Sequence, residues 1–352
     1  MGTAGQRVAL IGGAGFIGHH LALELAARGA TVSVVDSLEV NHLRAFTAAS
    51  PQLPRRQAYL RMLGTRLELL TAAGVTLHQQ DVRDARGVTT VLASLEPQVI
   101  VHLAAVAHAG QANADPQGAF AHSLQTLVNT LDWARRSRVE RFVFMSSSMV
   151  YGNFTTQEAT EEHPLAPVGI YGAMKVAAEK IVVAHGQVFD LPYSIVRPSA
   201  LYGPRCVSRR VIQAFIEAAL DGGPLVVDAD PTERIDFTYV DDLVAGLALV
   251  IDTPAALGET FNLTCGHARQ ISELVALMCD RFPGLGVKYV ARDKLRSRRG
   301  TLSIDKAARL LGYRPRHELE AGLGKYLAWY ATQDRHAAEP DVPATAAAQA
   351  LA

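Results

Sequence analysis

Two groups of side chains in the middle of the chain could move a proton. Tyr171 and Lys175 lie four residues apart in a predicted helix, so their side chains share one face. The ordinary pKa of a phenol is about 10, but a nearby ammonium or a cationic ring favours the phenolate and makes it a usable base. Ser146, Ser147 and Ser148 follow a predicted strand, and one of them could hydrogen-bond an oxygen that is being oxidised. A surface Tyr–Lys pair and a solvated serine loop are the simpler alternatives.

A glycine-rich turn near the N-terminus predicts a site for a dinucleotide. Gly12, Gly15 and Gly18 connect an apolar strand to a helix. This spacing permits a tight turn, a close approach of backbone amides to a pyrophosphate, and close packing of the helix on the strand. Asp36 ends the second strand, where a carboxylate can accept hydrogen bonds from ribose hydroxyls and would repel a 2′-phosphate. The expected cofactor is therefore NAD rather than NADP.

The elements that must position these residues alternate along the first half of the chain. Apolar strands are predicted at residues 7–11, 31–35, 75–79, 98–102 and 141–145, and helices at residues 16–28, 84–95 and 120–138. Near-continuous Val, Ile and Leu runs with intervening helices are typical of a doubly wound parallel α/β sheet, the Rossmann fold, which binds ligands outside the carboxyl ends of its strands. Residues 1–190 are the predicted NAD-binding domain, which includes the catalytic serine and the Tyr–Lys pair.

The second half of the chain predicts a smaller lobe. Strands are expected at residues 193–197, 225–227, 237–240 and 260–263, and helices at residues 207–220, 241–251, 272–282, 305–311 and 319–330. We expect residues 191–335 to form a mixed α/β lobe that mainly binds substrate, with some strands returning to the sheet and the substrate in the cleft between the lobes. Residues 336–352 are rich in Ala and Pro without an apolar face, which predicts a disordered tail.

One interruption separates the second and third strands. Residues 37–74 are too long for a plain connection between a strand and a helix, and residues 55–73 have the pattern of a basic amphipathic helix. An extra surface helix is the simpler interpretation of this insertion. A cap over the cofactor or a contact between subunits is the alternative.

Composition excludes several classes of protein. The 352 residues are 49% hydrophobic and 19% charged, which permits a sizeable core and argues against disorder. Lys plus Arg and Asp plus Glu number 34 each, and this zero net charge argues against a nucleic-acid coat or a membrane-surface protein. The three cysteines are too few for a disulfide framework or a four-ligand zinc site. No segment has the pattern of a membrane span or a signal peptide, so a cytoplasmic location is expected.

Histidines that suggest a metal site lack the partners that such a site needs. His102 and His108 lie near the end of one predicted strand, and His19 and His20 are adjacent on a predicted helix. No cluster of carboxylates or cysteines completes a ligand set beside any of them. We therefore expect no metal site.

Further motifs accompany these features in a fixed order. They are Asp81-Val82, Val101-His102-Leu103-Ala104-Ala105, Val150-Tyr151-Gly152, Arg197-Pro198, Leu201-Tyr202-Gly203-Pro204, Asp236-Phe237-Thr238-Tyr239-Val240-Asp241-Asp242 and Gly258-Glu259-Thr260-Phe261-Asn262. Over about residues 7–330, the chain resembles the extended short-chain dehydrogenase/reductase family and, within it, the NAD-dependent sugar epimerase/dehydratase group.

The resemblance implies a role for each matching residue. Tyr171 is the expected base, taking a proton from a sugar hydroxyl as hydride leaves to NAD. Lys175 would hold the ribose of the nicotinamide half and lower the pKa of Tyr171, and Ser147 would hydrogen-bond the reacting oxygen. The residues implied in cofactor binding are Gly12, Gly15, Phe16, Ile17, Gly18, Asp36, Asp81, Val82 (adenine), Leu103, Ala104, Ala105 (phosphates and ribose), Ser146, Tyr171, Lys175 and Pro198 (nicotinamide).

The two residues after Ser147 bear on the reaction. In sugar 4,6-dehydratases these positions are typically Asp and Glu, which supply the acid and base that eliminate water. Here they are Ser148 and Met149, neither of which can shuttle a proton. The serine-rich version is similar to 4-epimerases of UDP-hexoses and UDP-hexuronates, which oxidise C4, rotate the keto intermediate and return the hydride with tightly held NAD. A reductase or dehydrogenase with net redox turnover, a dehydratase and a non-catalytic NAD-binding protein are the alternatives.

Arginines are the expected contacts of a nucleotide-sugar diphosphate, although the chain departs from the family pattern in three places. Ala200 stands where many members carry Asn, one residue separates Arg234 from Asp236, and Arg292-Asp293-Lys294-Leu295 replaces Arg-Pro-Gly-Asp. The residues predicted to bind substrate are Ser147, Ser148, Arg205, Arg209, Arg234 and Arg299, with Arg210 and Arg298 as further candidates. A solvated basic surface is the alternative for each arginine. Residues 292–316 contain nine basic and two acidic side chains, so the neutral chain has a locally positive segment.

The resemblance also implies a homodimer. Family members often pair the helix before the serine strand with the Tyr–Lys helix, here residues 120–138 and 171–189. The side chains of this first helix that face either a partner or the sheet are Leu124, Leu127, Val128 and Leu131.

Overall fold

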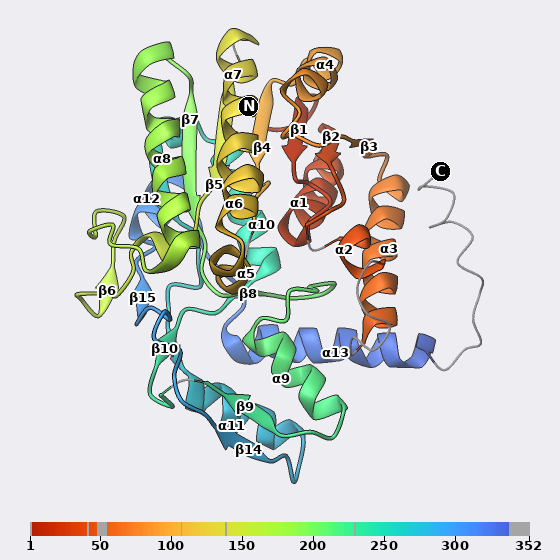
Figure 1. Ribbon diagram of the computed structural model, residues 1–352, viewed down its shortest axis with the longest axis vertical. Coiled ribbons are helices and arrows are strands. Elements are labelled where there is room, and N and C mark those ends of the chain that lie inside the picture. The colour runs from red at the N-terminus through yellow and green to blue at the C-terminus, as the bar shows by residue number, and fades with distance from the viewer. Residues whose placement is uncertain are drawn as a thin grey trace.

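A seven-stranded parallel sheet forms the centre of the molecule in the computed structural model, which describes residues 2–40, 42–47, 55–106, 108–137, 139–228 and 230–337 (Figure 1). Its strands are β1 (Arg7–Ile11), β2 (Thr31–Asp36), β3 (Thr76–Gln79), β4 (Val99–His102), β5 (Arg141–Met145), β7 (Tyr193–Arg197) and β12 (Glu259–Asn262). Their order across the sheet is β12-β7-β5-β4-β1-β2-β3, and every neighbouring pair is parallel. The order reverses between β1 and β4, so the carboxyl ends of these strands form the switch point at which such sheets bind ligands. The predicted Rossmann-type fold is confirmed.

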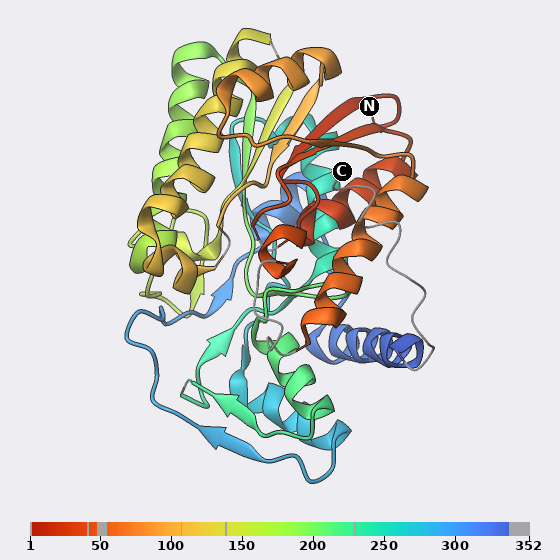
Figure 2. The same ribbon diagram turned by 45° about the vertical axis from the view of Figure 1, so that its right-hand side comes forward.

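Helices cover both faces of the sheet (Figures 1 and 2). One layer contains α4 (Ala85–Leu95), α7 (Thr126–Ser137) and α8 (Gly169–Phe189), and the other contains α1 (Phe16–Ala27), α10 (Val240–Asp252) and α12 (Asp305–Leu311). Successive side chains of a strand point to opposite faces. Val8 and Leu10 of β1 therefore pack in the core under α1 and α10, while Ala9 and Ile11 pack in the core under α7 and α8.

The helix predicted at residues 120–138 is divided in the structure. It consists of α6 (Pro116–Phe120), a π-helical turn (Ala121–Gln125) and α7, and a further helix, α5 (Ala109–Ala114), precedes it. The Asp115 carboxylate accepts a hydrogen bond from the Gly118 amide (2.9 Å) and caps α6, with Pro116 at its first position. The predicted helix is therefore present over residues 120–137, but it begins four residues earlier, at an Asp-Pro start signal that the prediction overlooked.

A second lobe lies below the sheet in Figure 1. Its elements are α9 (Val211–Leu220), β9 (Leu225–Val227), β10 (Arg234–Ile235), β13 (Arg269–Gln270), α11 (Ile271–Arg281), β14 (Val287–Tyr289) and α13 (Leu319–Ala337). Two short parallel pairs lie beside the central sheet: β8 (Leu201–Tyr202) with β11 (Thr238–Tyr239), and β6 (Glu158–Ala159) with β15 (Thr301–Leu302). Phe215, Ile235 and Leu274 belong to an apolar core of this lobe. Strands β7 and β12 return to the central sheet, and the domain boundary at residue 190 stays a prediction.

The insertion after β2 packs against both parts of the molecule. It contains α2 (Leu43–Thr47) and α3 (Arg56–Ala72). Along α3, Tyr59 and Leu63 join the core of the second lobe, whereas Leu70 joins the core beneath α1. The Tyr59 hydroxyl donates a hydrogen bond to the buried Glu217 carboxylate of α9 (2.6 Å). The insertion is therefore part of the structure between the lobes rather than a solvated surface helix.

The C-terminal helix is longer than predicted. Helix α13 continues to Ala337, two residues into the predicted tail, and residues 338–352 lie outside the described part of the chain. Among the described helices, none is long and apolar enough to cross a membrane. The remaining short helical turns are at Ser148–Val150 and Pro254–Ala256.

Two adjacent residues of α7 test which face of this helix packs on the sheet. Leu127 is fully buried in the sheet core and Val128 is 43% exposed. We expect Leu127→Ala to lower the free energy of unfolding by about 2–5 kcal/mol, because it leaves a cavity in a packed core. Val128→Ala is expected to change it by less than about 0.5 kcal/mol. Urea denaturation measures both, and equal losses would contradict the assignment of Leu127 to the core.

Candidate active site

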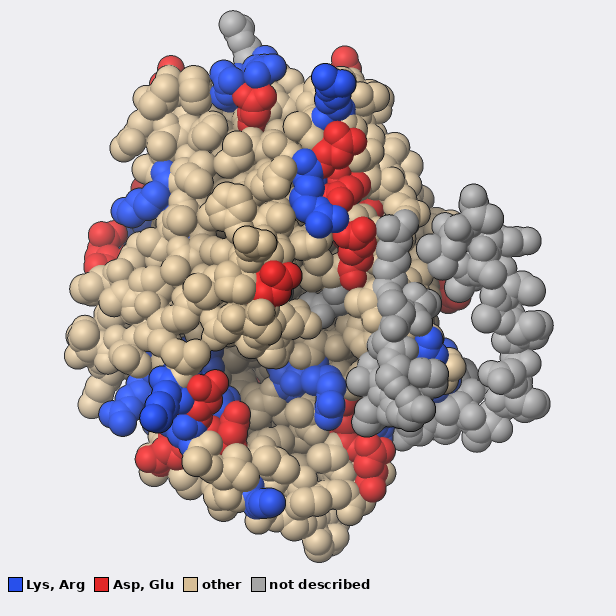
Figure 3. Space-filling model, viewed as in Figure 1, with Lys and Arg blue, Asp and Glu red and all other residues tan. Residues whose placement is uncertain are grey.

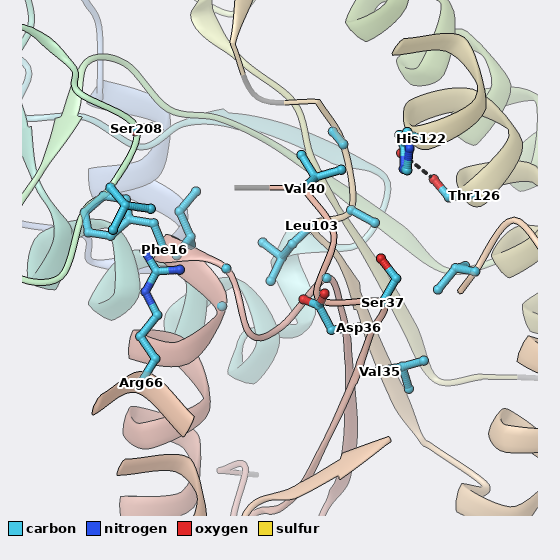
Figure 4. Close-up of a pocket in the computed structure, with 18 of the residues that line it drawn as sticks. Phe16, Val35, Asp36, Ser37, Val40, Arg66, Leu103, His122, Thr126 and Ser208 are labelled. Carbon is cyan, nitrogen blue, oxygen red and sulfur yellow. Dashed lines mark hydrogen bonds between the residues drawn. The ribbon is translucent and has the colours of Figure 1, made fainter. Parts of the chain in front are cut away.

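A pocket at the carboxyl edge of the sheet contains the glycine turn (Figure 4). The cofactor residues predicted for the adenosine and phosphate halves all line it: Gly12, Gly15, Phe16, Ile17, Gly18, Asp36, Asp81, Val82, Leu103, Ala104 and Ala105. The pocket also brings in residues to which sequence reasoning gave no role: Val35, Ser37, Val40, Arg66, His122, Thr126, Leu201, Val207 and Ser208. Arg210, one of the further substrate candidates, lies in the same wall.

The glycine turn has the shape that a pyrophosphate needs. Gly12 has a φ of +77°, and a Cβ atom there would lie 2.7 Å from the Ala104 backbone nitrogen. At Gly18 a Cβ atom would lie 2.5 Å from the Gly13 carbonyl oxygen, so a larger residue would push α1 away from the turn. Gly15 is the N-cap of α1 and offers no side chain to its first amides. An anion can bind these amides, which fits the phosphates of a dinucleotide.

Asp36 is oriented by two backbone hydrogen bonds. Its Oδ2 atom accepts from the Ala14 amide (3.0 Å) and its Oδ1 atom from the Leu38 amide (2.8 Å). Burial raises the pKa of Asp36 above its ordinary value, and the two backbone bonds oppose this rise. Each carboxylate oxygen keeps a second lone pair for another donor. The residue thus fits the ribose hydroxyls of NAD.

Asp81 lines the pocket, and its predicted contact with adenine stays a prediction. Its carboxylate is bound by Arg83 (Nη2–Oδ2 2.6 Å), which also pairs with Glu39 (2.8 Å). Hydrogen bonds from Arg83 lower the pKa of Asp81. Asp81 lines the pocket, but its carboxylate is already neutralised by this local network.

Tyr171, Ser147 and Lys175 come together at the end of β5 and the start of α8. The Ser147 hydroxyl is close enough to the Tyr171 phenol to lower its pKa. The Lys175 ammonium donates to the Met145 carbonyl at the end of β5 (2.7 Å) and lies 6.0 Å from the centre of the Tyr171 ring. Burial raises the pKa of Tyr171, while the positive charge of Arg210 and the Ser147 hydroxyl lower it. Arg210 is thus a cation that acts on the phenol, and the effect of Lys175 on the pKa of Tyr171 stays a prediction.

Glu179 is a functional candidate that the sequence analysis missed. It lies one further helical step of four residues after Lys175 and is 3% exposed. Its carboxylate forms a buried ion pair with Arg197 of β7 (2.7 Å) and accepts a hydrogen bond from Ser146. The sequence contained a signal for this residue, because Tyr171, Lys175 and Glu179 follow one another at intervals of four residues and so share one face of the helix. Glu179 holds α8 against the sheet rather than facing the pocket.

The serine run is divided among three tasks. The Ser146 hydroxyl donates to the Glu179 carboxylate, and its contact with the cofactor stays a prediction. Ser147 faces Tyr171, and its hydroxyl also accepts the Met149 amide (3.2 Å). The Ser148 amide donates to the Pro198 carbonyl (2.9 Å), which brings the Arg197-Pro198 motif beside the serines. Ser147 is the serine that acts on the phenol of Tyr171, and the ligand contacts of all three serines stay predictions.

The predicted substrate arginines take different positions. Arg205 donates to the His19 ring (3.0 Å), Arg209 pairs with Glu217 (3.6 Å), and Arg234 donates to the Ala268 carbonyl. These contacts turn the three side chains to other parts of the protein. Arg299 is different, because its buried Nε atom has no hydrogen-bond partner within the described part of the chain. Its burial and the charges of Arg296 and Arg210 lower its pKa to about 10, so it belongs to a concentrated positive region.

The family comparison matches residues 8–264 of the chain to the family described as the NAD dependent epimerase/dehydratase family. A dTDP-glucose 4,6-dehydratase of Streptomyces antibioticus is 31% identical over 332 residues, which cover 91% of this chain and 90% of that protein.

Solved structures of both reaction types have the same fold as this chain. The dTDP-glucose 4,6-dehydratase DesIV of Streptomyces venezuelae, solved with NAD, is 29% identical with a TM-score of 0.79, covering 95% of this chain and 99% of that one. A UDP-glucose 4-epimerase of Thermus thermophilus in complex with NAD is 26% identical with a TM-score of 0.78, covering 92% and 99%. NAD is therefore the cofactor of this family, and the pocket at the glycine turn and Asp36 has the lining predicted for it.

The buried ammonium of Lys175 predicts a pH-dependent stability. Burial lowers the pKa of Lys175 from its ordinary value of 10.5 to about 8. Between these values the unfolded chain binds more protons than the folded one, so the free energy of unfolding rises with pH in this window. We expect Lys175→Met to be more stable than the wild type at pH 7 by on the order of 2 kcal/mol, and this difference to shrink from pH 8 to pH 10.

Urea denaturation at several pH values measures this effect. Lys180→Met is the control, because Lys180 is an exposed residue of the same helix. A Lys175→Met variant less stable than the wild type at pH 7 would contradict a dominant cost of burying the charge.

Proposed function

The chain belongs to the NAD-dependent epimerase/dehydratase family, and we propose that it is a nucleotide-sugar epimerase that inverts C4 of a UDP-hexose or UDP-hexuronate. The observation that carries this proposal is the composition of the site beside Tyr171. Ser147 contacts the phenol, and the next two positions hold Ser148 and Met149. The relatives include dehydratases as well as epimerases, so the distinction rests on these residues.

Tyr171 performs both proton transfers in the proposed reaction. When bound, NAD would supply the acceptor for a hydride from the sugar carbon and the donor for its return. The phenolate takes the proton of the C4 hydroxyl as the ketone forms, and the phenol gives it back when the ketone is reduced on its other face. Ser147 holds the reacting oxygen, and Arg210 favours the phenolate because its charge lowers the pKa of Tyr171. Each cycle therefore has no net oxidation.

Elimination of water would need an acid and a base near C5 and C6 of the sugar, and the site is poor in both. Ser148 is 1% exposed, and Met149 has no proton to exchange. Among the described residues that line the pocket, the carboxylates are Asp36 and Asp81, on β2 and just beyond β3. These belong to the adenosine end predicted for the cofactor. This arrangement favours epimerisation over dehydration.

Arg210 and Arg299 are the proposed contacts of the substrate diphosphate. Arg210 lies in the pocket wall, and its charge acts on both Tyr171 and Arg299. Glu233, beside Arg299, already pairs with Arg292 (3.3 Å). On the face seen in Figure 3, basic side chains gather where the lower lobe meets the sheet, with acidic side chains among them. Planar guanidinium groups suit a diphosphate that spans this junction.

A homodimer through α7 and α8 is part of the proposal. Leu127 and Leu131 face the sheet core, but Val128 is exposed. Phe120 before α7 and Val188 near the end of α8 are also exposed, by 54% and 68%. These apolar side chains would be covered by a second copy.

A panel of nucleotide sugars tests the proposed reaction directly. We expect the purified protein to interconvert a UDP-hexose or UDP-hexuronate with its C4 epimer without added cofactor, and Tyr171→Phe to lower the rate by at least about 10²-fold. NMR identifies the products from UDP-glucose, UDP-N-acetylglucosamine and UDP-glucuronate. Release of a 4-keto-6-deoxy sugar would show a dehydratase instead, and a strict need for added NADH or NADPH would show a net oxidoreductase.

Arg210 is expected to set the lower pH limit of activity. Its charge lowers the pKa of Tyr171, so Arg210→Gln should raise that pKa and move the acidic limb of the kcat profile to higher pH. The same change should raise KM, because a diphosphate contact is lost. Arg209→Gln is the matched control, since Arg209 is exposed and pairs with Glu217. Identical pH profiles for the wild type and Arg210→Gln would contradict this role.

A further inference from the structure

Arg66, in the inserted helix α3, is a buried cation in the wall of the dinucleotide pocket. Its side chain is 1% exposed and points from α3 toward the end of the pocket where Phe16 lies (Figure 4). Its Nη1 atom donates to the Ala14 carbonyl of the glycine turn (3.3 Å). Its Nε and Nη2 atoms donate to the Arg205 carbonyl (3.2 and 2.6 Å). These acceptors are neutral, so none of them balances the charge.

The charge of Arg66 lacks a carboxylate partner within the described part of the chain. Among the described residues, no carboxylate forms an ion pair with it, although Asp36 is close enough to act on its pKa. The neighbouring imidazoles of His19, His20 and His42 have lowered pKa values and are neutral at pH 7. An unpaired guanidinium is costly to bury. A phosphate group in the pocket would supply the missing negative charge.

Arg66 also holds a strained loop of the second lobe. Residues 203–210 include Arg205 and Arg209 with φ angles of +61° and +49°, a conformation that is unfavourable for side chains larger than glycine. Besides the two bonds from Arg66, the loop is held by His20, whose Nε2 atom lies 3.2 Å from the Pro204 carbonyl oxygen. The end of this loop carries Ser208 and Arg210 into the pocket.

We propose that the insertion is a working part of the cofactor site, in which Arg66 pairs with the pyrophosphate of bound NAD and ties the 203–210 loop to the glycine turn. The pyrophosphate is the favoured phosphate because Arg66 bonds to Ala14, within the turn whose helix receives it. A 2′-phosphate would instead meet the carboxylate of Asp36. The inference needs the dinucleotide but not the sugar reaction, so failure of the epimerase proposal leaves it intact.

Binding measured without any sugar tests the inference. NAD and ADP-ribose are titrated by calorimetry, and adenosine by NMR, into the wild type, Arg66→Gln and Arg66→Lys after removal of retained nucleotide. We expect Arg66→Gln to weaken NAD and ADP-ribose by about tenfold or more, as for the loss of a hydrogen bond to a charged group, and to leave adenosine unchanged. Arg66→Lys, which keeps the charge, should recover part of the affinity. Arg61→Gln is the control, because Arg61 is exposed on the same helix.

The dependence of the Kd for NAD on ionic strength is a second test, because a purely structural role of Arg66 would leave this dependence unchanged. The Kd of the wild type for NAD should rise with ionic strength more steeply than that of Arg66→Gln. If Arg66→Gln does not fold, Arg66→Lys tests the proposal alone. This variant should bind ADP-ribose more weakly than the wild type does and adenosine equally well. Equal losses for adenosine and NAD, or no recovery with lysine, would overturn the proposal. Tight NADP binding that Arg66→Gln abolishes would overturn the assignment to the pyrophosphate.

Discussion

The buried ion pair between Glu179 and Arg197 fixes the position of helix α8, which carries Tyr171 and Lys175. Arg197 ends a strand of the sheet, and Glu179 lies on the face of α8 that also carries Tyr171 and Lys175. Such a pair repays its desolvation only when its remaining donors and acceptors are satisfied. Here Ser146 donates to Glu179, and Arg197 donates to the Tyr151 hydroxyl (3.0 Å) and to a backbone carbonyl (2.9 Å). The pair therefore sets which residues of α8 reach the end of β5.

The same network extends to the far edge of the sheet. The Tyr151 hydroxyl donates to Asn262 of β12 (2.6 Å), whose amide group in turn donates to the Ala159 and Ser303 carbonyls (3.1 Å each). One connected set of buried polar groups thus links Tyr151, which follows the serine run, with helix α8 and strand β12. A buried network that is fully hydrogen-bonded is rigid, because each group would lose its partners on moving.

Charge is distributed unequally around the cofactor pocket. Asp36 and Asp81 lie on β2 and just beyond β3, whereas Arg66 and Arg210 come from the insertion and the second lobe. A dinucleotide has neutral ribose hydroxyls at its adenosine end and charged phosphates at its middle. The zero net charge of the chain is therefore compatible with an anionic cofactor, because basic side chains enter the pocket from the insertion and the second lobe.

Local spacing was sufficient to predict the sheet and the glycine turn and to single out Asp36, Tyr171 and Lys175, whereas the role of Ser147 followed from the family resemblance. The periodicity of strands and helices and the i,i+4 spacing on one helix are properties of neighbouring residues, so the sequence by itself determines them. Only the tertiary structure decided which arginines line the pocket. Arg66 meets the carbonyl of Arg205 from 139 residues away, and left-handed backbone at Arg205 and Arg209 precedes the point where Arg210 enters the pocket. Such placement depends on how distant segments pack and on single backbone torsions, for which the sequence pattern has no periodic signal.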